Sequence, residues 1–466
     1  MRFDQTDNLS SDPIHGYIPF VSDRGLPSGE ASERQLVDHP WLQRLRQIHQ
    51  LQTAWWVFPA AEHTRFQHVL GAMHLASRAV AATYDSLREV CPDVPSRGYV
   101  ECLMRLAALL HDVGHGPFGH FFDRHFLADF GHTHETLGGL IVRRDLAELV
   151  SRVRRNPHSR LVDDERLDPE QIVYLIARPT GPESAGAPRW LTLLRSWFCG
   201  IYTVDNLDFV LRDAFMAGYS TRAFDLDRLL HYSFFTPQGL TIHSRGMPAL
   251  VRFMTARADL FRTIYFHRTV RAIDLALADL FAQSKRFLFA GNPAENLDAY
   301  RRLTEFSLLV DVARWPQAAD AQQRELGQRW ERLVNREIPW KMAAQRYLVF
   351  AAGAAEATSI FSQGQYVEER LRQRLPAALA ALPLRVDLAR HIHRPHTKGP
   401  SDGQNFLYDA DRDATVPLTD DQLYRQLPHS HRILRVYAHD ERHAAEISTA
   451  LDALIGPGAS DDVTNM

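Results

Sequence analysis

The chain has 466 residues, of which 45% are hydrophobic and 23% charged, a composition typical of ordinary globular proteins with one to three domains. Its formal net charge of -3 produces no overall field that attracts nucleic acid or an anionic membrane, so we expect neither as a partner. Three scattered cysteines argue against a disulfide framework, and no apolar run reaches about 18 residues, so we expect a cytoplasmic protein without a membrane span.

The pattern of apolar residues predicts mostly helices. After residue 40, apolar side chains recur at spacings of three and four, which is the period of a helix with one buried face. Turn-forming residues dominate before that point. The predicted segments are, in chain order, an irregular or short-stranded N-terminal segment over 1–39; helices over 41–51, 64–90 and 100–112; short helices and loops over 143–178; a proline- and glycine-rich break over 179–188; and further helices from Trp190 to about residue 383.

The last part of the chain differs in composition. Residues 388–430 are rich in histidine, proline and aspartate and are predicted to be loop-like, whereas 433–438 are typical of a strand and 441–455 of a helix. We therefore predict a mainly α fold, a helical bundle with a helical C-terminal extension and a small α/β tail. The predicted units span residues 1–39, 40–230, 231–385 and 386–466.

Several ionisable residues lie within residues 109–126, directly after the apolar run from Leu106 to Leu110. The pair His111-Asp112 directly follows that run, and buried ionisable side chains need a compensating group, most often a bound cation. Upstream, His68 shares one helix face with Arg65, three positions earlier. Both segments therefore place polar chemistry on helix faces that also carry apolar residues.

A polar stripe further along the chain supplies another carboxylate. Neutral imidazole from His68 and His111 and carboxylate from Asp112 and Asp205 form a mixed set that suits Fe, Mn, Zn, Co or Ni better than a thiolate-preferring ion. Such a set leaves coordination positions for water and substrate, as a hydrolytic site requires. The stripe, on one face of a predicted helix, is Asp205, Asp208, Phe209, Arg212 and Asp213.

These residues lie in motifs that occur in a fixed order. Together the motifs resemble the HD superfamily of metal-dependent phosphohydrolases, and within it the dNTP triphosphohydrolase branch. The likeness is greatest to the catalytic domain of the sterile-alpha-motif/HD-domain triphosphohydrolases of animals and their bacterial relatives, over about residues 12–275. The motifs are QRLRQIHQL (43–51), WVFPA (56–60), HTRFQHVLG (63–71), LLHDVGHGPFGH (109–120) and HE (134–135).

The resemblance implies a hydrolase that cleaves a deoxynucleoside triphosphate at the α-phosphorus, giving a nucleoside and tripolyphosphate. Residues 40–230 would form the HD catalytic domain, and 231–385 would complete the substrate pocket. The resemblance also implies a divalent metal at the HD site, Mg²⁺ brought with the substrate, a nucleotide activator and a homo-oligomer, either dimer or tetramer.

The resemblance further implies roles for single residues. The metal ligands would be His68, His111, Asp112 and Asp205. The triphosphate would meet Arg65, His115, His134 and Arg268, and His120, supported by Asp123, would protonate the leaving 5′-oxygen. The sugar would be held by Gln50 and Asp213 and packed by Leu51, and a regulatory guanine would be contacted by Asp38, Gln43 and Arg46.

The chain departs from this family at the substrate side. Asn206 and Phe209 replace a cationic residue and a tyrosine, and near the family's aromatic screen of the sugar 2′ position we find Ala276. Two alternatives therefore stay open: an HD phosphohydrolase of another nucleotide, such as a signalling nucleotide or a nucleoside monophosphate, and a non-catalytic nucleotide sensor. His120 argues against the sensor, because a sensor needs no proton donor.

Overall fold

The computed structural model describes residues 7–177, 186–350, 363–392, 405–427 and 430–455. It is mainly helical with three small sheets, which confirms the predicted fold class. The predicted break over 179–188 lies largely outside the described residues. Every helix in the described part of the chain is too short or too polar to cross a membrane.

The bundle is organised around α3 (Arg65–Val90) and α4 (Arg97–Leu110), which pack against each other, and α10 (Val204–Met216) packs on α3. Every residue of α4 from Gly98 to Leu110 is buried, so this helix lies at the centre of the bundle. The helices predicted over 64–90 and 100–112 are thus confirmed. The other α-helices and strands of this part are β1 (Asp7–Asp12), β2 (Gly16–Val21), α1 (Glu33–Val37), α2 (Pro40–Gln43), α5 (His120–His125), α6 (His134–Ile141), α7 (Ala147–Ser151), α8 (Pro169–Ala177), α9 (Arg189–Leu194) and α11 (Leu226–His231).

The extension after α11 contains strands that the sequence analysis did not predict. Its helices are α12 (Met247–Leu260), α13 (Arg268–Leu288), α14 (Leu297–Arg302), α15 (Glu305–Arg314) and α16 (Ala321–Val334). Its strands are β3 (Ser233–Thr236), β4 (Gly239–His243) and β5 (Lys341–Phe350). The helical prediction was wrong at these strands, because β5 owes its structure to pairing with a distant strand, which local periodicity does not report.

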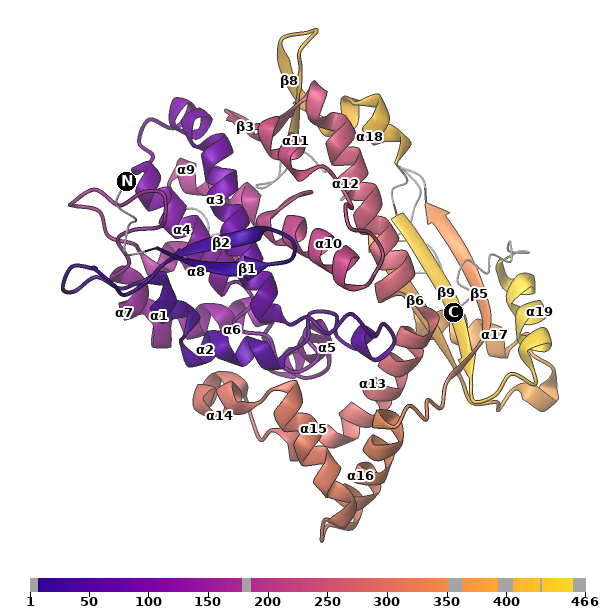
Figure 1. The fold of residues 1–466 in the computed structure, drawn as a ribbon. Coiled ribbons are helices and arrows are strands. Elements are labelled where there is room, and N and C mark those ends of the chain that lie inside the picture. The colour runs from indigo at the N-terminus through magenta and orange to yellow at the C-terminus, as the bar shows by residue number, and fades with distance from the viewer. Residues whose placement is uncertain (1–6, 178–185, 351–362, 393–404, 428–429, 456–466) are drawn as a thin grey trace.

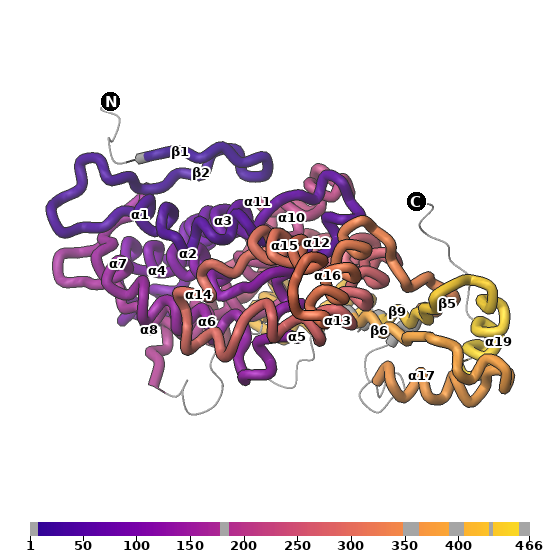
Figure 2. The backbone as a smooth tube through the Cα atoms, turned by 90° about the horizontal axis from the view of Figure 1, so that it is seen from below, coloured from indigo at the N-terminus to yellow at the C-terminus, as the bar shows by residue number. Residues whose placement is uncertain are grey.

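The tail forms an antiparallel sheet in the order β5-β9-β6, with β6 (Leu384–Ile392) and β9 (Ser430–Ala438). The helices α17 (Gly364–Arg372) and α19 (Ala444–Ile455) enclose a second, small apolar core on one face of it. Figures 1 and 2 both show this sheet at the end of the molecule away from the β1–β2 hairpin, with α13 beside it. The predicted loop over 388–430 was wrong where β6, β7 (Phe406–Asp409), β8 (Ala414–Pro417) and α18 (Gln422–Gln426) lie, since β7 pairs with β4 across the chain.

A buried ion pair fastens the β1–β2 hairpin to the bundle. Arg105 of α4 is 0% exposed and donates to both carboxylate oxygens of Glu33, at 2.5 and 2.8 Å. The same guanidinium donates to the Pro19 carbonyl of β2, and Glu33 accepts from the Val21 amide. Burial lowers the pKa of Arg105, but the Glu33 carboxylate outweighs burial and the pKa is raised. A two-stranded hairpin alone is marginally stable, so these contacts hold it in place.

Candidate functional site

Four side chains from three helices converge within the bundle. His68 lies in the first turn of α3, His111 and Asp112 follow α4, and Asp205 lies in the first turn of α10. His68 Nε2 lies 3.3 Å from His111 Nε2 and 3.1 Å from Asp205 Oδ1. His111 Nε2 lies 3.3 Å from Asp112 Oδ1. The structure thus brings together the four residues that the sequence predicted as metal ligands, named here the metal group.

The hydrogen bonds of the two imidazoles make the metal group fit a cation. His68 Nδ1 donates to Asp208 Oδ2 and His111 Nδ1 donates to the Ala108 carbonyl, each over 2.7 Å. Both partners only accept, so each Nδ1 carries a proton and each Nε2 points inward as the ring atom that can bind a cation. The ligand atoms of His68, His111 and Asp112 lie within 4.8 Å of one another and could hold a divalent metal, and Asp205 Oδ1 lies 3.1 Å from His68 Nε2.

The electrostatics of the metal group favour positive charge at its centre. Burial lowers the pKa of His68, but hydrogen bonds to Asp205 and Asp208 outweigh it and raise the pKa to about 10. Burial raises the pKa of Asp205, whereas His68 and His111 lower it, to about 2. A cation in place of the His68 proton would therefore meet ionised carboxylates.

Asp208 orients His68, a role that the sequence analysis did not assign. Its buried carboxylate accepts from His68 Nδ1 and from His15 Nε2, both at 2.7 Å, and from two nitrogens of Arg212 at 2.9 Å. His15 lies in the turn between β1 and β2, and Arg212 also donates to Asp12 of that hairpin. The signal in the sequence was the helix face that Asp208 shares with Asp205 and with Arg212, four residues after it.

Replacing Asp208 with asparagine is expected to weaken metal binding about 10- to 100-fold, because an uncharged amide with one accepting oxygen holds the ligating tautomer of His68 less firmly. Metal affinity measured by competition with a chelator checks this. Asp227→Asn is the matched control, since Asp227 pairs with Arg78 and its side chain is 87% exposed. Equal affinities of the wild type and Asp208→Asn would contradict the role given to Asp208.

Arg65 lies beside the metal group with donors to spare. Its Nη1 donates to Asp112 Oδ2 over 2.6 Å, whereas its buried Nε has no partner among the described residues. Gly119, with φ +55°, packs so closely that a Cβ there would lie 2.3 Å from Arg65 Nη2. A buried N–H without an acceptor favours an anionic ligand, in agreement with a phosphate contact.

A second polar cluster lies where α5 and α6 begin. Asp123 Oδ2 accepts from His134 Nδ1 at 2.6 Å and from His120 Nδ1 at 3.2 Å, and the ring of His115 stacks on that of His134 with centroids 3.7 Å apart. Burial lowers the pKa of His134, but the hydrogen bond to Asp123 raises it overall, while burial and Arg65 lower the pKa of His115. The His120 side chain is 65% exposed, so it is the member of the cluster that can meet an incoming ligand.

The residues predicted to hold the sugar are linked through His63. Asp213 Oδ1 accepts from His63 Nε2 over 2.7 Å, and the backbone N–H of Gln50 donates to the His63 carbonyl over 3.0 Å. The Gln50 Oε1 atom is buried and has no partner among the described residues, so it is open to a ligand hydroxyl. Leu51 is buried next to it in the chain.

The sequence analysis missed an aromatic side chain that contacts Asp213. The Tyr265 hydroxyl donates to Asp213 Oδ2, and burial raises the pKa of Tyr265 well above its usual value. Ala276, which the sequence analysis aligned near the family's aromatic residue at the sugar 2′ position, is buried within α13. Asn206 and Phe209 are half-buried on α10, and Arg268 is the first residue of α13.

The predicted regulatory residues are held in local hydrogen bonds near α1 and α2. Arg46 Nε donates to Gln43 Oε1 over 2.8 Å, and the Arg46 guanidinium lies 3.7 Å from the centre of the Phe66 ring. Asp38 accepts from Arg34 Nε at 3.1 Å. The structure therefore groups Gln43 with Arg46, whereas the Asp38 carboxylate is engaged by Arg34.

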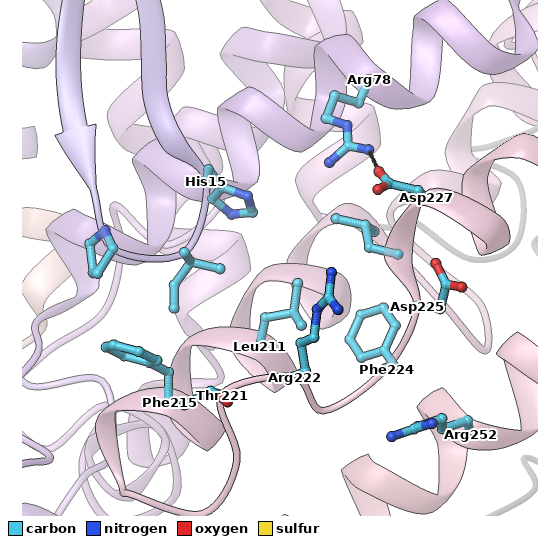
Figure 3. Close-up of a pocket in the computed structure, with 13 residues that line it drawn as sticks. His15, Arg78, Leu211, Phe215, Thr221, Arg222, Phe224, Asp225, Asp227 and Arg252 are labelled. Atoms are coloured by element: carbon cyan, nitrogen blue, oxygen red, sulfur yellow. Dashed lines mark hydrogen bonds and ion pairs between the residues drawn. The ribbon is translucent and has the colours of Figure 1, made fainter.

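Figure 3 shows a cavity of about 530 Å³ that shares His15 with the network behind the metal group. None of the four predicted metal ligands lines it, so it is distinct from the predicted substrate site. The side chains of Arg78, Arg222 and Arg252 line it together with apolar residues. The full lining is Pro13, Ile14, His15, Arg78, Leu211, Phe215, Thr221, Arg222, Phe224, Asp225, Leu226, Asp227 and Arg252.

Comparison with known proteins shows what this chain is similar to. Residues 65–177 match the family model of the HD domain. The chain is 26% identical over 353 residues to the uncharacterized protein YwfO of Bacillus subtilis, covering 71% of each protein. It is 24% identical over 467 residues to the deoxynucleoside triphosphate triphosphohydrolase SAMHD1 of Bos taurus, covering 93% of this chain and 75% of that protein.

A solved structure has the same fold. It is a hypothetical protein from Aquifex aeolicus, with a TM-score of 0.67 and 21% sequence identity, and the match covers 96% of this chain and 100% of that one. The segment that matches the HD family holds His68, His111 and Asp112. Residues 65–177 therefore match the HD domain, and over most of its length the chain is similar to deoxynucleoside triphosphate triphosphohydrolases.

Proposed function

We propose that this protein is a metal-dependent hydrolase that cleaves deoxynucleoside triphosphates at the α-phosphorus to a nucleoside and tripolyphosphate. The observation that carries the proposal is the convergence of the metal group, the spare donors of Arg65 and the cluster around Asp123. We infer that His68, His111, Asp112 and Asp205 hold the metal and that it is Fe, Mn, Zn, Co or Ni. A divalent ion there would act as a Lewis acid and would supply an activated water at neutral pH.

The side chains around the metal group would divide the remaining work. Arg65 would neutralise charge on the phosphate oxygens, joined by His115, His134 and Arg268. His120 would donate a proton to the leaving 5′-oxygen, and the Asp123 carboxylate would hold its ring in place.

The sugar would be recognised at the Gln50 side of the site. Gln50 Oε1 has no partner among the described residues and can accept from the 3′-hydroxyl. His63 links the Gln50 backbone to Asp213, which would hold the sugar with it. Leu51 would pack against the ring. We further propose that Asp38, Gln43 and Arg46 bind a nucleotide activator in a homo-oligomer, a dimer or a tetramer.

A product-resolved assay tests the proposed function. Metal-loaded protein is incubated with each dNTP and rNTP, with and without GTP, and nucleosides, monophosphates and polyphosphates are separated. We expect nucleoside and tripolyphosphate from dNTPs. Monophosphate with pyrophosphate, or no turnover of any of them, would contradict the proposal.

A second candidate is an HD phosphohydrolase acting on another nucleotide. It is favoured by Asn206 and Phe209, which remove a cation and a phenolic donor from α10 and weaken the match to a triphosphate chain. Signalling nucleotides and nucleoside monophosphates added to the same substrate panel decide between the two. Tight nucleotide binding without turnover would favour a non-catalytic sensor instead.

A further inference from the structure

The C-terminal sheet makes a buried ionic contact with α13, the helix that begins at Arg268. Asp387 of β6 is 5% exposed and accepts from Arg271 through two parallel bonds, Nη2 to Oδ1 at 2.6 Å and Nε to Oδ2 at 3.1 Å. Figure 1 shows β6 and α13 as neighbours. A two-pronged bond of this kind fixes the guanidinium in orientation as well as position.

Arg271 is also connected, through Asp274, to the loop that follows Gln50. Its Nη1 donates to Asp274 Oδ2 over 2.9 Å. The other oxygen of the buried Asp274 accepts from Gln52 Nε2 at 2.8 Å and from Thr53 Oγ1 at 2.5 Å. An unbroken series of hydrogen bonds therefore joins the sheet to the chain segment 50–53, named here the Gln50 loop.

The backbone of the Gln50 loop needs outside support. Gln52 is a non-glycine residue with φ +51°, in the left-handed region that costs free energy for any residue with a Cβ. Its side-chain bond to Asp274 holds it there. Because Gln52 follows Gln50 and Leu51, a change in its backbone would move both side chains that we place on the sugar.

A second contact from the same sheet reaches the phosphate side. The hydroxyl of Tyr437, a buried residue of β9, donates to the Arg268 carbonyl over 2.8 Å. This bond holds the first residue of α13. Two strands of one sheet thus contact α13: β6 through Arg271, which leads to the Gln50 loop, and β9 through the Arg268 carbonyl.

We propose that the C-terminal sheet positions the substrate side of the site, with Asp387 as the positioning residue, an inference that rests on the sugar-binding role proposed for Gln50 and Leu51. Asp387 does not touch the substrate. It acts through Arg271 and Asp274, so its loss should loosen the Gln50 loop and spare the metal group.

The variant Asp387→Asn tests this in the full-length, metal-loaded protein. We expect KM for the dNTP to rise about tenfold with kcat changed by less than about twofold, since binding geometry and not chemistry is disturbed. Bound metal should be unchanged. Amide hydrogen exchange should become about tenfold faster at Gln50 and Ala54, whose amides bond within and beside the loop.

The matched control is Asp452→Asn. Asp452 of α19 accepts from Arg346 Nε of β5 over 2.9 Å, a contact of the same sheet that does not involve α13. This variant should leave KM and the exchange of the Gln50 loop unchanged. Should Asp387→Asn fail to fold, Arg271→Lys keeps the charge but loses the paired bond to Asp387, and the same shifts are expected.

The outcomes separate this inference from the proposed function. If the wild type hydrolyses no dNTP, the proposed function fails, and the exchange measurement alone decides whether Asp387 positions the loop. Equal exchange at Gln50 and Ala54 in the wild type and the Asp387→Asn variant would overturn the inference. A fall in kcat with lost metal would overturn it too, because the effect would then lie in the metal group.

Discussion

Replacing Asp205 with alanine is expected to remove both the bound metal and all turnover. Asp205 Oδ1 lies 3.1 Å from His68 Nε2 and 3.8 Å from His111 Nε2, so the carboxylate closes the metal group from the α10 side. Without it two imidazoles and one carboxylate remain, and a divalent ion loses a charged ligand. Elemental analysis of the purified variant and the product-resolved assay measure the two losses.

The contrasting variant is His120→Ala. Its side chain is 65% exposed and bonds Asp123, not a predicted metal ligand, so bound metal should match the wild type. Turnover should fall by about 10²–10⁴-fold, the usual contribution of a positioned proton donor. Loss of metal in both variants, or in neither, would refute the separate roles of the two residues.

Replacing Glu33 with alanine is expected to lower the free energy of unfolding by about 3–5 kcal/mol, because a buried ion pair then loses one partner. Arg105 is 0% exposed and would keep its charge without the carboxylate that receives two of its bonds. The Val21 amide would also lose its acceptor. Urea unfolding of the wild type and the variant measures the difference.

The control for Glu33 is a surface pair of the same type. Glu170 accepts hydrogen bonds from Nε and Nη2 of Arg143, but the two side chains are 58% and 47% exposed. Glu170→Ala should therefore lower the free energy of unfolding by less than about 1 kcal/mol. Similar losses in Glu33→Ala and Glu170→Ala would show that burial of the Arg105 pair does not matter.

The parts of the site that the sequence predicted are those whose residues lie close together in the sequence. His68 and Arg65 stand three apart on one helix, and His111 and Asp112 are adjacent, so a helical reading places each pair without knowledge of the fold. Their meeting with Asp205 was expected from the family resemblance. The mainly α fold followed from the same period of three and four.

The parts that the sequence did not predict depend on contacts between distant segments. His15 contacts Asp208 from the turn of the N-terminal hairpin, and the Tyr265 hydroxyl contacts Asp213 from the segment between α12 and α13. The residues of each pair are far apart in the sequence, so no local spacing predicts that they meet. The strands β5 and β6 were missed for a similar reason, since each exists by pairing with β9.

The place of His15 and Asp12 behind Asp208 and Arg212 bears on how the protein can be divided for study. A fragment cut to the matched segment 65–177 would lack Asp205, and one begun at Pro40 would leave the carboxylate of Asp208 open to water on its hairpin side. A truncated chain could therefore keep the HD sequence signature and still bind metal weakly. Experiments on metal content should retain residues 7–21, and affinity tags are better placed where they cannot disturb that hairpin.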